Sequence, residues 1–158
     1  MKKLLSVILA FGLVLGLSAC GSNGNSAGGA KGDGMTLTEI MDAILDGVEN
    51  LPESESVELT GEKWETYAFI TPAEGMEGRA SDALMSPVAH SVVLVRVPEG
   101  ADAKEVAAEI EENANPNKWI CVVAEKTIVR RHGNTILLVM SYEELADTIA
   151  GNFDKLFE

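Results

Sequence analysis

Two adjacent residues, His90 and Ser91, carry the groups of a hydrolytic pair, because an imidazole can deprotonate a hydroxyl that then attacks a substrate. They open an apolar, β-branched run, Val92–Val95, that is typical of a strand. Neighbouring side chains of a strand point to opposite faces, so the imidazole and the hydroxyl are expected to diverge. The sequence therefore favours a polar pair at a strand end. A hydrolase that uses His90 or Glu125 remains an alternative.

The common catalytic and cofactor motifs are absent from the sequence. It has no glycine-rich phosphate loop, no HExxH, no CxxC pair and no GxSxG. His90 and His132 alone cannot build a structural zinc site. The acidic run from Glu53 to Glu65 lacks the alternating aspartates and central glycine of an EF-hand loop, so we expect a solvated linker. We predict no metal, no cofactor and no catalytic residue.

One strong motif lies near the N-terminus, where Leu17-Ser18-Ala19-Cys20-Gly21 resembles a bacterial lipobox. Two lysines precede the apolar run Leu4–Leu17, which is shorter than the ~20 residues of a membrane span. This pattern predicts a signal peptide over residues 1–19, cleaved between Ala19 and Cys20. Cys20 would then be acylated on sulfur (a palmitate-type modification), and two acyl chains suffice for stable anchoring.

A single domain is expected to follow a short tether. Residues 20–34 comprise the lipidated cysteine and a Gly/Ser/Asn-rich stretch, which predicts a flexible coil. Residues 35–158 are then one domain. With 12 Lys+Arg against 25 Asp+Glu, the net charge of −13 excludes a typical nucleic-acid binder. The acyl chains, rather than the acidic surface, would hold the domain at the extracytoplasmic face of the cell membrane.

Three helices are predicted from spacing and capping signals. The first begins at the capping box Thr36–Glu39 and ends before Pro52. The second begins near Asp102 and stops before Pro116, and the third opens at a capping box, Ser141–Glu144.

Strands are expected between these helices, with a glycine-containing turn at 133–134 and a loop over 72–88. The expected strands are 66–70 at an edge, 89–97 at the centre, 119–124 joined with a bend to 127–131, and 135–140. The order is α-β-β-α-β-β-α. It predicts an α+β domain whose mainly antiparallel sheet, of about four strands, is covered by three helices.

Four side chains are candidates for contact with a partner or ligand. Trp64 stands at a strand entrance and serves either the core or a ligand platform, with the core favoured. Arg130 and Arg131 belong to the basic cluster at the hairpin, which serves an acidic partner or simply protects a sheet edge. His90 completes the set. Cys121 lies in an apolar run and is expected to be buried as a small hydrophobe.

The chain resembles a family of small lipoproteins from low-GC Gram-positive bacteria whose function is unknown. The resemblance covers about residues 36–158 in addition to the lipobox. It rests on 89–97, Asn113, Pro116, 118–122, Gly133-Asn134, 137–141, Phe153 and Phe157. It implies a domain between membrane and cell wall, and it supplies no catalytic residues.

The leading functional hypothesis is a non-enzymatic, membrane-anchored domain that binds an envelope protein or peptide. The expected edge strand at 66–70 would offer a site for strand addition. Alternatives are a small-solute-binding lipoprotein, with a pocket near Trp64 or the 72–88 loop, and a cell-envelope hydrolase with an unrecognised site.

Overall fold

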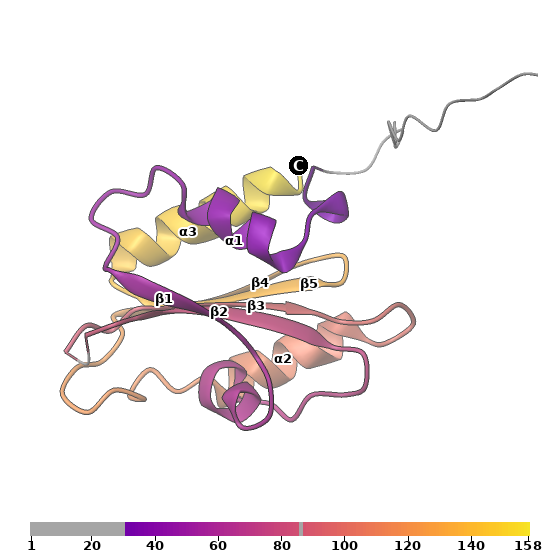
Figure 1. The fold of residues 1–158 in the computed structure, drawn as a ribbon, viewed down its shortest axis with the longest axis horizontal. Coiled ribbons are helices and arrows are strands. Elements are labelled where there is room, and N and C mark those ends of the chain that lie inside the picture. Colours follow the sequence, from indigo (N-terminus) through magenta and orange to yellow (C-terminus); the bar gives the residue numbers. More distant parts are fainter. Residues whose placement is uncertain (1–30, 86) are drawn as a thin grey trace, which may run out of the picture.

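A computed structural model describes residues 31–85 and 87–158 as a five-stranded antiparallel sheet between two helical layers (Figure 1). The α+β class is confirmed, with five strands in place of about four. The elements in chain order are η1 (Lys31–Gly34), α1 (Leu37–Leu45), β1 (Ser54–Glu58), η2 (Trp64–Ala68), β2 (Glu77–Ala83), β3 (Ser91–Arg96), α2 (Ala103–Asn113), β4 (Lys126–His132), β5 (Thr135–Ser141) and α3 (Glu143–Leu156).

The strand order in space is β1-β2-β3-β5-β4, so β3 and β5 lie in the interior of the sheet. Both strands read as almost unbroken apolar runs because helices cover both faces of the sheet. The expected central strand at 89–97 and the Gly133-Asn134 hairpin are confirmed.

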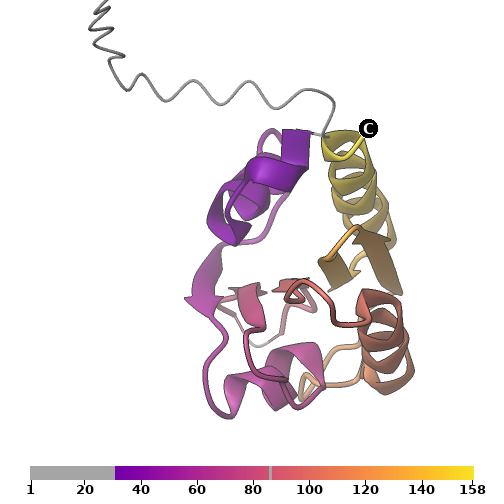
Figure 2. The same ribbon diagram turned by 90° about the vertical axis from the view of Figure 1, so that its right-hand side faces the viewer.

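Two hydrophobic cores lie on opposite faces of the sheet (Figure 2). On one face α1 and α3 pack against Leu94 and Val139. On the other face α2 and η2 pack against Val93 and Leu138. Because adjacent residues of one strand serve different cores, each strand ties the two helical layers together.

The N-terminal caps of α1 and α2 are those that the sequence predicted, and the cap of α3 is not. Thr36 and Glu39 form the predicted reciprocal capping box of α1, and Asp102 accepts from two backbone N–H groups of α2. The predicted cap at Ser141 is wrong, because this residue belongs to β5 and its hydroxyl contacts His90. Instead the carboxylate of Glu125 accepts the backbone N–H of Glu143 at 3.0 Å.

The predicted edge strand at 66–70 is also wrong, because η2 is a π-helical turn. Trp64 and Ala68 are four residues apart and both are buried, as expected for one face of a helical turn. The turn ends at Phe69, whose φ of 60° is left-handed. The strand-addition site that this segment was expected to offer is therefore absent.

Two strands occupy segments that the sequence analysis treated as linker and loop. β1 forms within the acidic run, and β2 forms within 72–88. Their signal is weak because β1 turns only Val57 towards a core, while β2 turns the small Gly78 and Ala80 inward. Gly78 has to be small, since an added Cβ would lie 2.8 Å from the ring of Trp64.

The apolar run at 119–124 forms no strand and crosses the surface as an irregular segment. Ala124 donates to the carbonyl of Pro116 at 3.0 Å, which folds the segment back on itself. Cys121 is exposed, so its predicted burial is wrong. The run pairs with none of the five strands, and β4 begins only at Lys126.

Candidate functional site

A row of side chains crosses one end of the sheet, close to η1. Arg96 at the end of β3 lies opposite Glu77 of β2 and opposite Thr135 of β5, and Thr135 lies opposite His132 of β4. Residues directly opposite each other in antiparallel strands project from the same face, here the face covered by α1 and α3. The sheet thus brings a cation, a carboxylate and a hydroxyl together from distant parts of the chain.

The guanidinium of Arg96 is half-buried and bound to neutral oxygens. Its Nη1 donates to the carbonyl of Met35 at 2.8 Å, while Nη2 and Nε donate to the Thr135 hydroxyl at 3.2 and 3.4 Å. None of the ion pairs found among the described residues includes Arg96. A guanidinium has five N–H donors, so each terminal nitrogen keeps one further donor. The contacts fix this cation in place and leave it able to bind an anionic group.

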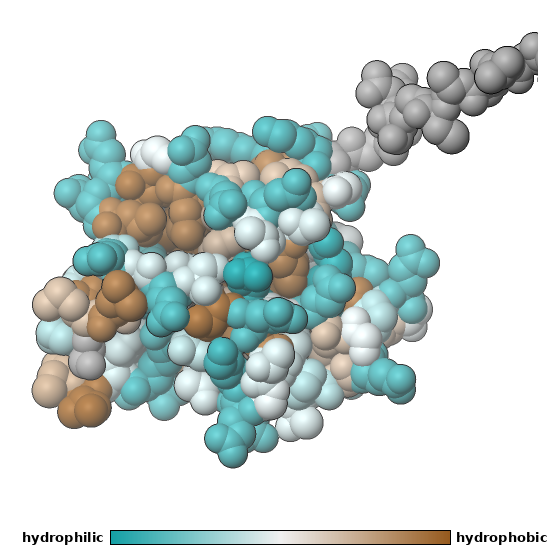
Figure 3. Space-filling model, in the orientation of Figure 1, coloured by the Kyte–Doolittle hydropathy of each residue, from teal (hydrophilic) through white to brown (hydrophobic). Residues whose placement is uncertain are grey.

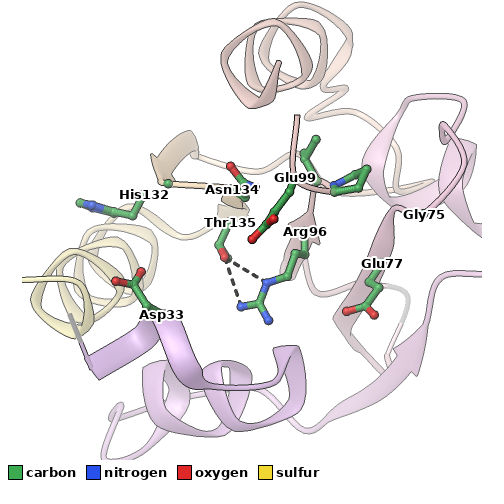
Figure 4. A pocket seen from close by; sticks show the side chains of 11 residues that line it. Asp33, Gly75, Glu77, Arg96, Glu99, His132, Asn134 and Thr135 are labelled. Carbon is green, nitrogen blue, oxygen red and sulfur yellow. Dashed lines mark hydrogen bonds between the residues drawn. The ribbon is translucent and has the colours of Figure 1, made fainter. Parts of the chain in front are cut away.

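Arg96 lines a pocket of about 500 Å³. Figure 4 shows Arg96 between the carboxylates of Asp33, Glu77 and Glu99, with Asn134 and Thr135 on another side. The volume falls in the range of small-molecule sites. The pocket therefore combines one central cation with an acidic rim.

Aromatic packing fixes the wall of the pocket beside η1. The imidazole of His132 stacks on Phe157 with ring centroids 5.2 Å apart, and its Nε2 lies 2.9 Å from Asp154. Gly32 lies against the same phenyl ring, because an added Cβ would come within 2.5 Å of it. Residues 31–34, which the sequence places in the tether, thus pack on the C-terminal end of the domain. This packing positions the Met35 carbonyl that holds Arg96.

Trp64, one of the predicted contact residues, lies in the core. It is only 4% exposed and, like Leu59, packs against Gly78. The interpretation as a core residue, which the sequence favoured, is confirmed, and the platform alternative does not hold.

His90 and Ser91 diverge, as their adjacent positions predicted. The Nδ1 atom of His90 lies 2.9 Å from the Ser141 hydroxyl, whereas the Ser91 hydroxyl accepts from Lys118 at 2.9 Å. His90 is fully buried, and its Nε2 has no partner among the described residues. Burial lowers the pKa of His90 from 6.5 to about 4, with a smaller lowering from Lys118 and an opposing effect of Asp82. The imidazole is therefore neutral at pH 7 and shielded from substrate.

Lys118 is the centre of a polar cluster on the α2 side of the sheet. Its Nζ lies 2.8 Å from Asp82 of β2, and it lies over the rings of Tyr67 and Trp119 at 4.8 and 5.0 Å. Burial lowers the pKa of Lys118, and the ion pair with Asp82 opposes this effect. The fully buried Ser91 hydroxyl beside it is inaccessible to a substrate. The cluster holds the irregular segment against the sheet.

Arg130 and Arg131 stay on the surface and do not converge on one site. Arg130 lies 3.5 Å from Asp154, and Arg131 donates to the carbonyl of Gly133 in the hairpin turn. Sequence reasoning missed Arg96. The signal was a single arginine at the end of the apolar run Val92–Val95, where a strand passes from the core to a polar margin.

Apolar side chains are exposed at the opposite end of the domain from η1. We call this set the distal patch: Leu84, Met85, Ile120 and Val123. Its members come from the β2–β3 connection and the irregular segment, which the Lys118–Asp82 ion pair joins. Figure 3 shows hydrophobic residues at the lower left, where these loops lie in Figure 1.

No group of three or more His, Cys, Asp or Glu side chains within 31–85 and 87–158 could hold a metal ion. The same residues contain no helix long and apolar enough to span a membrane. The predicted signal peptide and Cys20, whose acylation the sequence predicts, lie outside the described residues. Comparisons with protein families, curated proteins and solved structures found no match.

Proposed function

We propose that this chain is an extracytoplasmic lipoprotein, anchored through Cys20, whose domain binds a small carboxylate-bearing solute in the Arg96 pocket. The observation that carries the proposal is the half-buried guanidinium, which is held by neutral oxygens and lines a pocket of about 500 Å³. A rigidly held arginine with spare donors suits the planar geometry of a carboxylate. The lipobox at Leu17–Cys20 supports the anchor.

A hydrolytic role receives less support, because the two residues named for it have other contacts. His90 is buried against Ser141, and Glu125 caps α3 through the backbone N–H of Glu143. Neither side chain lines the Arg96 pocket.

A second candidate function is the docking of an envelope protein at the distal patch. Leu84 and Ile120 are 54% and 91% exposed, which is unusual for large apolar side chains that lie close together. The patch lies at the far end of the domain from Lys31, where the described chain begins (Figure 1). This position favours a protein partner with an apolar surface over the lipid that holds the anchor.

Thermal unfolding of the full-length chain in detergent, with a panel of amino acids, peptides, sugars, nucleotides and metal ions, separates the two functions. A bound solute at a hundred times its dissociation constant adds about 2.7 kcal/mol, a rise of a few degrees in Tm. We expect carboxylate-bearing solutes to raise the Tm of the wild type and of the control Arg79→Gln, but not of Arg96→Gln. A panel without any shift would contradict solute binding and favour the distal patch.

A further inference from the structure

We infer that the solute of the Arg96 pocket is a zwitterion, a free amino acid or a short peptide, with its carboxylate on Arg96 and its ammonium group between Glu77 and Glu99. This inference rests on the proposed function and specifies the substrate class. It starts from the charges of the lining, where Arg96 is accompanied by Asp33, Glu77 and Glu99.

The acidic rim disfavours a ligand that carries only negative charge. Like charges close to a carboxylate are destabilising, and this chain has a net charge of −13. A ligand with one carboxylate and one ammonium group instead satisfies the cation and the rim together. The two ligand charges must then lie a few ångströms apart, as they do in amino acids and small peptides.

The cross-strand geometry leaves room for such a ligand. Glu77 lies directly opposite Arg96 in the ladder, where side chains come close enough to form an ion pair, yet these two form none. Figure 4 shows the Glu77 carboxylate apart from the guanidinium, and Glu99 reaching towards it from the segment after β3. Both glutamates are exposed, so their carboxylates can reorient around an ammonium group.

A purely cationic ligand would satisfy the acidic rim but leave the Arg96 guanidinium without an anionic partner. The Met35 carbonyl and the Thr135 hydroxyl hold the guanidinium of Arg96 in the pocket. The lining of Asn134 and Thr135 adds amide and hydroxyl groups, which can bind a peptide group.

Titration calorimetry of the full-length chain with three matched dipeptides tests the inference. L-alanyl-L-alanine carries both charges, its N-acetyl derivative only the carboxylate, and its C-terminal amide only the ammonium group. We expect each capped form to bind at least ~10-fold more weakly, since a hydrogen bond to a charged group is worth about 1.5–3 kcal/mol. Arg96→Gln should remove the preference for a free carboxylate.

A charge-removing variant makes the test sharper. Glu99→Gln and Glu77→Gln should each lower the affinity for the free dipeptide. They should raise the affinity for the N-acetyl form, because its carboxylate is then repelled by one glutamate fewer. Glu74→Gln, an exposed glutamate that does not line the pocket, is the control and should leave both affinities unchanged.

The outcomes separate this inference from the proposed function. If the N-acetyl form binds as tightly as the free dipeptide and loses affinity in Arg96→Gln, the pocket takes simple carboxylates. The inference that the solute is a zwitterion is then wrong, while the proposed solute-binding function stands. If none of the three dipeptides binds at millimolar concentration, the inference fails. The thermal panel then decides whether solute binding fails with it.

Discussion

The buried His90 should make the domain sensitive to mild acid. Its pKa is about 4 in the folded chain, whereas an unfolded chain restores the ordinary value of 6.5. Between these two values the unfolded state binds more protons than the folded state, so the free energy of unfolding rises with pH. His90 therefore contributes its full stability above pH 6.5, and this stability is lost as the pH falls towards 4.

The size of the effect follows from the same pKa values. Each pKa unit between the folded and unfolded states is worth ~1.4 kcal/mol, so the titration of His90 by itself should remove about 3 kcal/mol of stability between pH 7 and pH 4. This is a large part of the ~5–15 kcal/mol that stabilises a typical domain. Urea unfolding measures it as a fall in midpoint of roughly 1 M or more, at ~1–3 kcal/mol/M.

The matched variant is His90→Asn, which keeps a polar partner for Ser141 and cannot be protonated in this range. It should be less stable than the wild type at pH 7, but its loss between pH 7 and 4 should be smaller by about 3 kcal/mol. His132→Asn, which removes the partly exposed histidine, is the control and should retain the loss due to His90. Equal pH slopes for the wild type and His90→Asn would refute the reasoning.

Three other predictions concern packing and anchoring. Gly78→Ala should lower the free energy of unfolding by about 1–3 kcal/mol and shift the fluorescence of Trp64. Gly151→Ala, in open space on α3, should raise the free energy of unfolding by up to about 1 kcal/mol, measured for both variants by thermal unfolding. Lys118→Met should lower stability by a few kcal/mol and increase amide exchange in 114–125, and unchanged exchange there would argue against its role as a clamp. Cys20→Ala should abolish lipid labelling and release the chain from membranes, and persistent labelling would rule out the lipobox.

Sequence patterns predicted the elements whose side chains obey a strong periodicity. A helix buries the apolar stripe of α1 along one face, and a strand covered on both faces buries the run Val92–Val95 of β3. Each pattern therefore indicated one type of element. The turn at Gly133 was also predictable, because a hairpin turn requires a positive φ, here 53°, that glycine adopts readily.

Other elements depend on tertiary partners that a local pattern does not contain. β2 faces a core through the small residues Gly78 and Ala80, and Gly78 must be small because it lies against Trp64. The apolar run around Cys121 looked like a strand, but no sheet edge meets it. Local periodicity does not decide whether such a segment forms a strand, because the result depends on the strands that lie beside it.

The candidate site was hidden from the sequence for the same reason. Arg96, Glu77 and Thr135 are far apart along the chain, and only the register of three strands places them side by side. The residues that sequence reasoning selected instead serve the fold: Trp64 fills a core, and His90 holds Ser141.

The most direct test of solute binding at Arg96 is to observe its guanidinium while a ligand is added. The sequence has four arginines, so the side-chain Nε–Hε resonances of ¹⁵N-labelled full-length chain in detergent micelles form a small, assignable set. We expect L-alanyl-L-alanine to shift the Arg96 resonance in a saturable manner and to leave those of Arg79, Arg130 and Arg131 unchanged. An unchanged Arg96 resonance at saturating solute, or a shift at another arginine instead, would contradict the proposed site.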